Sequence, residues 1–471
     1  MKLSILWTDW LIYLLVVSTI VFVLVVRRHE HLRAPWRKVF HSASGMISLT
    51  VLSFFVAVGL LDSVHYRPRL SAPEGQPVQY SVEALSILDW LTTPLRTRLE
   101  KTYSAPFAVH SYAKETMTLL DGREAREFPR LKFGGAHLAD PQNDRWPDIG
   151  RRISLSVAIA IVVWLVLAAV LAQVLARRGD ESFGEAQRRI WHGETAIPWR
   201  AVLITVAVML LLIVVAVMLS PWYHILGTGK VGQDVFYQAL KSIRTGLVIG
   251  TLTTLIMLPF ALLLGIMAGY FRGWIDDVIQ YLYTVLNSIP GVLLIAAAVL
   301  MTQVYMDTHP ELFPTINERA DLRLLFLCII LGITSWTGLC RLLRGETLKL
   351  REMEYIQSAH ALGVSDFRIL ARHILPNVMH IVLIAVVLDF SGLVLAEAVL
   401  CYVGVGVDPS MISFGTMINS ARLEMAREPM VWWSLAAAFT FMFTLVLFAN
   451  LFADAVRDAF DPRARQKLVT T

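Results

Sequence analysis

The chain contains 471 residues, of which 56% are hydrophobic and 17% are charged, and its formal net charge is +5. This much apolar sequence, concentrated in blocks of about 20 residues, excludes an ordinary soluble domain and indicates a polytopic membrane protein. The positive charge is small and unevenly distributed, so membrane topology explains it better than a nucleic-acid partner does.

The apolar blocks are candidate membrane spans. They cover roughly 5–26, 44–62, 153–175, 199–220, 245–270, 277–303, 323–343, 379–400 and 431–455. Every backbone polar group in a bilayer must be satisfied within its own segment, so these spans are expected to be helices. The predicted fold class is therefore an all-α polytopic membrane protein with about nine transmembrane helices and a small external (periplasmic) domain.

Basic residues orient the spans. Short loops within 27–38 and 177–200 are rich in arginine and are expected to face the cytosol. Alternation then places the amino terminus outside, and it places 345–378 and the tail 456–471 in the cytosol. The long segment 63–152 is exempt from this rule, because loops of more than about 60 residues cross regardless of their charge.

The first part of the chain is predicted to form two spans, in 1–62, joined by a basic cytosolic loop. That loop contains His29, Glu30 and His31, whose spacing differs from that of a helical zinc site, so a solvated turn is favoured over metal binding. The first span lacks a small-residue cleavage site and ends at Arg27 and Arg28, so it is expected to be retained rather than removed as a signal peptide.

Residues 63–152 are predicted to form the external domain, with a helix-like patch at 82–99. All three cysteines of the chain, Cys328, Cys340 and Cys401, lie in or beside spans, so this domain is expected to fold by burial alone. A third additional span and a cytosolic loop follow in 153–198.

Residues 227–230 read Gly-Thr-Gly-Lys, which superficially resembles a phosphate-binding loop. That motif requires glycine where His224 stands and serine or threonine where Val231 stands, and it follows a strand rather than a membrane span. Nucleotide binding by this chain is therefore excluded. Turn residues followed by a helix that starts near Asp234 explain the segment better.

Four residues interrupt apolar runs and are candidates for a translocation pathway: Asn287, Pro290, Asp389 and Glu397. An ionisable group at membrane depth costs about 2.5 kcal/mol or more and usually faces a bundle interior or a cavity. For both carboxylates, structural pairing with neighbouring groups is an equally weighted alternative. Pro290 is expected to kink its helix.

The segment 354–377 is basic, helix-patterned and too polar to span a bilayer. Its apolar or small residues recur at helical spacing, at Ile356, Ala359, Gly363 and Phe367 among others. Glycine inside a helix costs about 1 kcal/mol relative to alanine, so Gly363 is expected to mark a break or a close approach. The predicted pieces are 353–362 and 365–373.

Several motifs in 199–465 together resemble permease subunits of ABC importers, in particular the dipeptide/oligopeptide/nickel family. Residues 355–363 with 374–377 are similar to that family's cytosolic EAA loop. The other matching motifs are Leu226 to Thr228 with Gly232 to Val235, Ala268 to Tyr270 with Gly273, Trp274 and Asp276, Glu397 and Ala398 with Leu400 and Val403 to Gly406, Ser413 to Gly415, and Arg457 to Arg463. The chain departs from the family pattern at Gln357, Ser358, Gly229 and Gln233, and 1–198 has no counterpart in a typical member.

This resemblance implies a type I permease core in 199–455 whose loop 345–378 couples it to ATPase subunits. The implied partners are a second homologous permease, two ABC ATPase subunits that bind ATP and Mg, an external solute-binding protein and membrane lipid. The implied location is the bacterial inner membrane. The resemblance implies no catalytic, cofactor or metal site in this chain. The expected coupling residues are Tyr355, Ile356, Gln357, Ala359, Gly363, Phe367, Arg368, Leu375 and Pro376.

In this interpretation the face containing Ile356 and Phe367 docks into a groove of the ATPase. Peptides are the leading solute, with metal chelates, opines and nucleoside-peptide antibiotics open. The alternative is a secondary transporter or channel that uses Asp389 and Glu397 as a relay. A membrane enzyme has no support, because the sequence shows no nucleophile–base pair or metal-spaced cluster.

Overall fold

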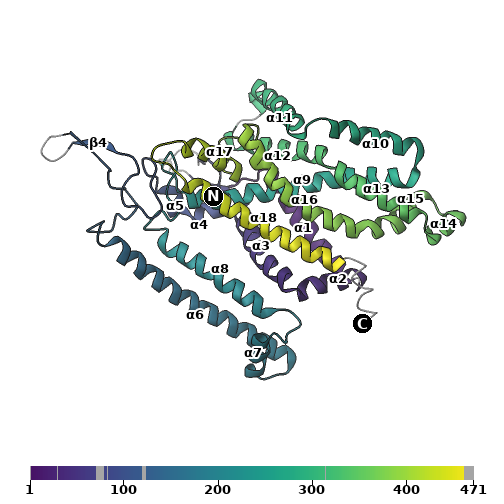
Figure 1. The fold of residues 1–471 in the computed structure, drawn as a ribbon, viewed down its shortest axis with the longest axis horizontal. Helices are drawn as coiled ribbons and strands as arrows, with labels where there is room; N and C mark the ends of the chain where they lie inside the picture. The colour runs from purple at the N-terminus through teal and green to yellow at the C-terminus, as the bar shows by residue number, and fades with distance from the viewer. Residues whose placement is uncertain are drawn as a thin grey trace.

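The computed structural model describes residues 2–28, 30–69, 79–81, 83–118, 124–312 and 315–460. His29 and the tail from 461, with Asp461, Pro462 and Arg463 of the last motif, lie outside the described residues. Figure 1 shows an elongated bundle of helices. The described residues of 63–144 gather at one end, which is called the domain end. Residues 345–378 lie at the other end, which is called the loop end.

The described residues contain nine segments that are long and apolar enough to cross a membrane, which confirms the predicted all-α class. They are α1 (Trp7–Arg28), α3 (Ala43–Asp62), α6 (Arg145–Gly179), α8 (Trp199–Leu219), α9 (Val235–Phe271), α11 (Gly291–Thr308), α12 with α13 (Ile316–Arg351), Asp366–Val403, which ends in α16 (Leu375–Val403), and α18 (Trp433–Phe460). Much of their apolar surface is exposed, as expected for helices that contact lipid.

One predicted span differs from its observed form. The block 277–303 is not a single kinked helix: α10 (Gly273–Ser288) and α11 are separate helices that meet at Ile289 and Pro290. Proline has no amide hydrogen and disfavours helical geometry in the residue before it, so the chain leaves the helix at this point. Pro259, in contrast, is accommodated inside α9.

The long helix α9 is the centre of the bundle, and it packs against α3, α10, α12, α13, α16 and α18. Its contact with α13 (Thr337–Arg351) is close because Gly265 and Gly269 face that helix. A Cβ at these positions would lie 2.8 Å from the Cys340 carbonyl oxygen and 2.7 Å from the Arg344 carbonyl oxygen. Small residues four apart let two membrane helices approach in this way.

The residues of 1–198 are built into this bundle. Helix α3 packs against both α9 and α18, and α8 packs against α3 and α6. Helix α3 therefore lies between α8 and the central helices, as Figure 1 shows. The short helices α2 (Glu30–His41) and α7 (Phe183–His192) follow the basic ends of α1 and α6.

The described part of the segment 63–144 contains only short strands and helices. Strands β1 (Lys2–Leu3), β2 (His65–Arg67) and β3 (Leu85–Ser86) form one antiparallel sheet, and β4 (Glu115–Thr118) pairs with β5 (Glu124–Glu127). The helix-like patch is confirmed as two short helices, α4 (Ile87–Leu91) and α5 (Thr93–Thr97). Two buried side chains of this segment belong to clusters shared with membrane helices: Tyr103 packs with α9 and α18, and Val109 packs with the end of α8. This segment therefore packs directly against the membrane helices.

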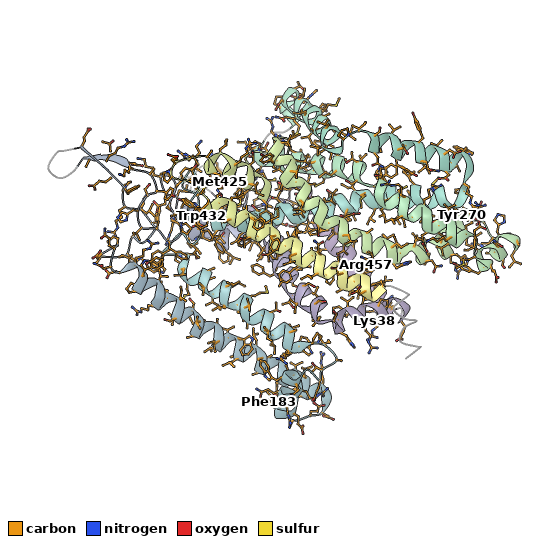
Figure 2. All side chains as sticks on the ribbon, in the orientation of Figure 1. Lys38, Phe183, Tyr270, Met425, Trp432 and Arg457 are labelled. Carbon is orange, nitrogen blue, oxygen red and sulfur yellow. The ribbon has the colours of Figure 1, made fainter. Side chains whose placement is uncertain are left out.

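Figure 2 shows how side chains mark the two ends of the bundle. Lys38, Arg457 and Tyr270 lie toward the loop end, and Met425 and Trp432 lie toward the domain end. Helix α17 (Phe414–Met425) caps the bundle at the domain end, between α16 and α18.

Candidate functional site

The 354–377 loop projects at the loop end as two short helices rather than one. Helix α14 (Glu354–Ala361) ends before Gly363, α15 (Asp366–Ile369) follows, and a π-helical turn, η2 (Leu370–Ile374), leads into α16. The predicted break is confirmed, since Gly363 adopts φ +75°, a region that favours glycine. The alternative of a close approach is wrong within this chain, because a Cβ there would meet nothing within 4 Å.

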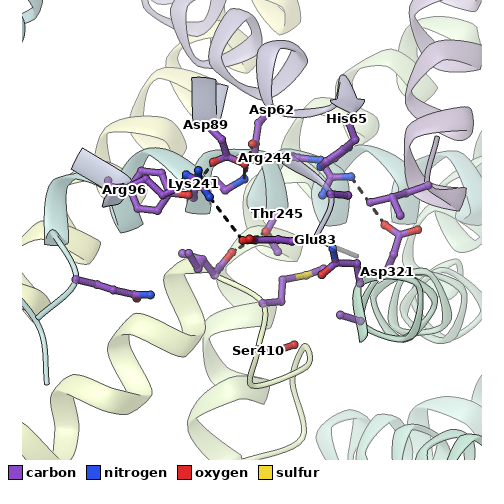
Figure 3. A pocket seen from close by; sticks show the side chains of 18 of the residues that line it. Asp62, His65, Glu83, Asp89, Arg96, Lys241, Arg244, Thr245, Asp321 and Ser410 are labelled. Carbon is purple, nitrogen blue, oxygen red and sulfur yellow. Dashed lines mark hydrogen bonds and ion pairs between the residues drawn. The ribbon is translucent and has the colours of Figure 1, made fainter. Parts of the chain in front are cut away.

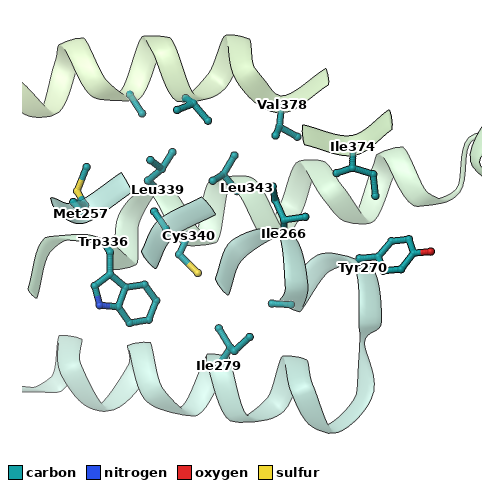
Figure 4. Close-up of a cluster of buried hydrophobic side chains, with 14 of the residues drawn as sticks. Met257, Ile266, Tyr270, Ile279, Trp336, Leu339, Cys340, Leu343, Ile374 and Val378 are labelled. Atoms are coloured by element: carbon teal, nitrogen blue, oxygen red, sulfur yellow. The ribbon is translucent and has the colours of Figure 1, made fainter. Parts of the chain in front are cut away.

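One side of this loop is fixed to the ends of α9 and α13. Ile356, Ile369 and Ile374 are buried in one cluster with Leu343, shown in part in Figure 4. The Tyr270 hydroxyl at the end of α9 donates a 2.7 Å hydrogen bond to Asp366. The loop is therefore a rigid continuation of the bundle.

The other side of the loop is exposed. Leu362 is 83% exposed and Phe367 is 81% exposed, whereas Ile356 is only 2% exposed. Ile356 therefore anchors the loop to its own chain, which corrects the expectation that Ile356 and Phe367 form one docking face. Leu362 was missed because it falls outside the apolar stripe.

The remaining predicted coupling residues of the loop differ in exposure. Tyr355, Gln357, Arg368 and Pro376 are exposed, and Ala359 and Leu375 are half-buried. Gln357, at the position where the resemblance expects glutamate, donates a 3.2 Å hydrogen bond from its amide to the Glu352 carbonyl oxygen. Their part in coupling stays a prediction.

The four predicted pathway residues do not share one environment. Asn287 accepts a 3.1 Å hydrogen bond from Thr337, and both Asn287 and Pro290 are exposed at the break between α10 and α11. Asp389 is half-buried in the middle of α16 and has no hydrogen bond or ion pair with the described residues. It remains the best pathway candidate of the four.

Glu397, in contrast, is a structural residue, as the alternative interpretation allowed. It is 1% exposed, and its carboxylate accepts hydrogen bonds from the Ser413 hydroxyl (2.7 Å) and the Gly415 amide (3.2 Å). It thereby holds the amino end of α17 on α16, where the helix dipole favours a carboxylate. These contacts favour the structural alternative for Glu397 over a place in a pathway.

A charged cluster at the domain end was not predicted from sequence. It surrounds a cavity of about 310 Å³ and joins residues of 1–152 to α9 (Figure 3). The Arg244 guanidinium donates hydrogen bonds to Asp9 (2.7 Å) and Thr8 (2.9 Å) of α1. Asp9 also pairs with His65 of β2 at 2.8 Å.

Lys241, one turn before Arg244 on α9, is paired with two carboxylates from residues 1–152. Its ammonium lies 2.8 Å from Asp62 at the end of α3 and 3.0 Å from Asp89 of α4. Asp89 also accepts a 2.7 Å hydrogen bond from Tyr237. Both cations of α9 are thus paired with carboxylates that lie more than 150 residues away in sequence.

A second contact at the domain end involves the loop before α9. His224 Nδ1 lies 2.7 Å from Asp234, and its Nε2 lies 3.5 Å from Glu100. Burial alone would lower the pKa of His224, but the hydrogen bond with Asp234 and the charge of Glu100 raise it to about 9. Gly232 has φ +73°, and a Cβ there would lie 1.8 Å from the Glu100 carbonyl oxygen, so this loop fits closely onto residue 100.

Comparison with known proteins agrees with these features. Residues 261–466 match the family described as binding-protein-dependent transport system inner membrane component. An oligopeptide transport system permease protein OppC of Mycobacterium tuberculosis (strain ATCC 25618 / H37Rv) is 31% identical over 242 residues, which cover 51% of this chain and 77% of the relative. The chain belongs to the permease family of binding-protein-dependent ABC importers.

Two further relatives support this assignment. A glutathione transport system permease protein GsiD of Pectobacterium atrosepticum is 32% identical over 244 residues, covering 51% of this permease and 73% of the relative. A dipeptide transport system permease protein DppC of Bacillus subtilis is 27% identical over 244 residues, covering 52% and 70%. The permease is thus a multi-pass transport subunit of the inner membrane, and the matched family region contains the 354–377 loop and α17.

Proposed function

We propose that this permease forms the translocation pathway of an ATP-driven importer for peptides or related small solutes. The names of the OppC, DppC and GsiD relatives support a peptide-type solute. The observation that carries the ATP-driven mechanism is the 354–377 loop, which presents Leu362 and Phe367 to a partner while its other side is fixed to α9 and α13.

The proposed partners are a second homologous permease, two cytosolic ATPase subunits that bind ATP and Mg, and an external solute-binding protein. Burial of each large apolar side chain in an ATPase groove contributes about 1.5–3 kcal/mol, so Leu362 and Phe367 together can anchor the loop. Because Ile356 and Asp366 tie the loop to the bundle, a movement of the ATPase is passed to α13 and α16 as a rigid-body movement.

In the proposed topology the domain end and the amino terminus face outward and the loop end faces the cytosol. The basic residues of α2 at the loop end support this orientation. The segment 63–152 then stands beside the solute-binding protein, with a docking or gating role. We divide the chain into five functional regions within one bundle: 1–62, 63–152, 153–198, 199–455 and 456–471.

A secondary transporter that uses Asp389 and Glu397 is less well supported, because Glu397 is buried and bonded to the end of α17. The proposal is tested by assembling the permease with the second permease and the ATPase subunits in nanodiscs and measuring ATP hydrolysis. We expect the loaded solute-binding protein to stimulate hydrolysis in the complex with the unchanged permease and not in one with Phe367→Ala. Failure of the ATPase subunits to associate with the permease would contradict the proposal.

A further inference from the structure

A second cavity opens at the domain end, next to the charged cluster. Its volume is about 660 Å³, within the range of about 300–1,000 Å³ that is typical of ligand sites. It is lined by the loop before α9, the loop between α16 and α17, α17 itself and Tyr103 from the segment 63–144. Helices α9 and α18 line it with residues near their amino ends, Gln238 and Ser434, and α16 is represented by the loop that follows it.

Glu424 of α17 is an unusual part of this lining. It is 7% exposed, and its Oε1 accepts a 3.1 Å hydrogen bond from the Tyr103 hydroxyl. Its Oε2 is also buried but has no hydrogen-bond partner among the described residues. Burial raises the pKa of Glu424, although Tyr103 and the positive charges of Arg427 and Lys230 act against this increase. A buried carboxylate oxygen without a donor costs free energy, which a cationic ligand group would recover.

The same cavity contains two cations. Lys230 and Arg427 line it, and neither forms an ion pair with the described residues. The Arg427 guanidinium instead lies over the Tyr103 ring, 5.1 Å from its centroid. This distinguishes the cavity from the charged cluster beside it, where Lys241 and Arg244 are already held by carboxylates.

The rest of the lining suits a variable ligand. Met411, Met417 and Leu423 supply apolar wall, and methionine adapts readily to side chains of different shape. Gln233 and Gln238, which are hydrogen-bonded to each other at 2.9 Å, add amide groups that can bind a peptide backbone.

We propose that this cavity binds a short zwitterionic peptide at the outer mouth of the permease. Its amino group contacts Glu424 Oε2 and its carboxylate contacts Lys230 and Arg427. The inference rests on the proposed function. It assigns the recognition of both peptide ends to one site, which Tyr103 of the segment 63–144 helps to form. An amphoteric site of this kind selects free peptide ends over blocked ones.

The test uses the full chain in lipid nanodiscs, with dialanine as the probe and calorimetry as the measurement. We expect N-acetyl-dialanine and dialanine amide each to bind the unchanged protein about tenfold more weakly than dialanine, since each lacks one charge-assisted contact. Glu424→Gln keeps an acceptor for Tyr103, and we expect about the same loss for dialanine. Glu428→Gln, an exposed glutamate in the loop that follows α17, is the matched control and should bind as the unchanged protein does.

Equal binding of free and blocked dialanine, unaltered binding by Glu424→Gln, or no binding to the unchanged protein would overturn the inference. The blocked-peptide comparison needs no variant, so it stands even if Glu424→Gln folds poorly. Uptake by the complete importer is measured in parallel. ATP-driven peptide uptake without this charge dependence would reject the cavity as the site and leave the proposed function intact, whereas absence of any peptide uptake would reject the proposed function.

Discussion

Arg244 of α9 donates a 2.7 Å hydrogen bond to Asp9 of α1, two residues separated by 235 positions in sequence. Both side chains are buried, and the pair connects the first additional helix directly to the central helix of the permease core. A buried pair of this kind contributes little net stability compared with an apolar pair, but the loss of one partner leaves a charge unpaired. The additional helices are therefore an integral part of the bundle.

We expect Asp9→Asn to lower the free energy of unfolding by about 3–5 kcal/mol, because Arg244 would keep a buried charge without its main partner. Thermal unfolding in mixed micelles measures this loss. Asp277→Asn, an exposed aspartate on α10, is the matched control and should change stability little. In the Arg244→Met background Asp9→Asn should cost less, and equal costs in the two backgrounds would refute the pairing.

The two sides of the 354–377 loop should respond differently to truncation. Ile356→Ala is expected to reduce stability by about 2–5 kcal/mol, because it leaves a cavity in the cluster at the loop end. Leu362→Ala and Phe367→Ala should leave stability nearly unchanged and weaken binding of the ATPase subunits. Unfolding curves and affinity of the purified permease for the ATPase distinguish the two effects. Wild-type affinity in the Leu362→Ala/Phe367→Ala double variant would show that this surface is not the contact.

Gly363 is required for its backbone angle rather than for space. We expect Gly363→Ala to cost about 1–2 kcal/mol of stability, because an L-residue is strained at φ +75°. Gly363→Asn should cost less, since asparagine tolerates this region. Gly338→Ala, in α13 with no atom within 4 Å of the new Cβ, should be neutral or slightly stabilising. If alanine and asparagine at 363 have the same effect, the angle is not the reason for the glycine.

The contact of His224 with Glu100 and Asp234 predicts a dependence of stability on pH. The pKa of His224 is raised from 6.5 to about 9, so its contribution is complete below about pH 6.5 and is lost as pH rises to 9. Burial raises the pKa of Glu100, but His224 and three backbone amides lower it from 4.5 to about 2, so its contribution is lost as pH falls from 4.5 to 2.

Unfolding temperatures measured from pH 3 to pH 10 test this dependence. His224→Gln should flatten the loss on the basic side relative to the unchanged protein. His192→Gln, an exposed histidine at the end of α7, serves as the control and should keep the full loss. A His224→Gln profile parallel to that of the unchanged protein would contradict the assignment.

Much of the fold follows from the sequence because membrane burial imposes long apolar blocks and because glycine and proline act locally. The spans of the described residues, apart from the division of 277–303 into α10 and α11, and the break at Gly363 were predictable for these reasons. Partners that are distant in the chain were not. Arg244 and Asp9 each look unremarkable alone, and only the packing of α1 on α9 makes them a pair.

The orientation of the 354–377 loop was also beyond sequence reasoning. Helical spacing put Ile356 and Phe367 on one stripe, but the left-handed turn at Gly363 separates α14 from α15, so one residue faces the bundle and the other faces away. In the sequence, Glu397 is an acidic residue within an apolar run. Its hydrogen bond with the Gly415 amide could not be predicted, because it depends on the packing of the amino end of α17 against α16.

The most direct test of the central claim is uptake of labelled dialanine into proteoliposomes that contain this permease, its partner permease and the ATPase subunits, with the solute-binding protein on the outer side. We expect uptake that requires ATP, that is lost with Leu362→Ala/Phe367→Ala, and that is insensitive to a proton ionophore. Uptake that persists without the ATPase subunits and collapses with the proton gradient would contradict it.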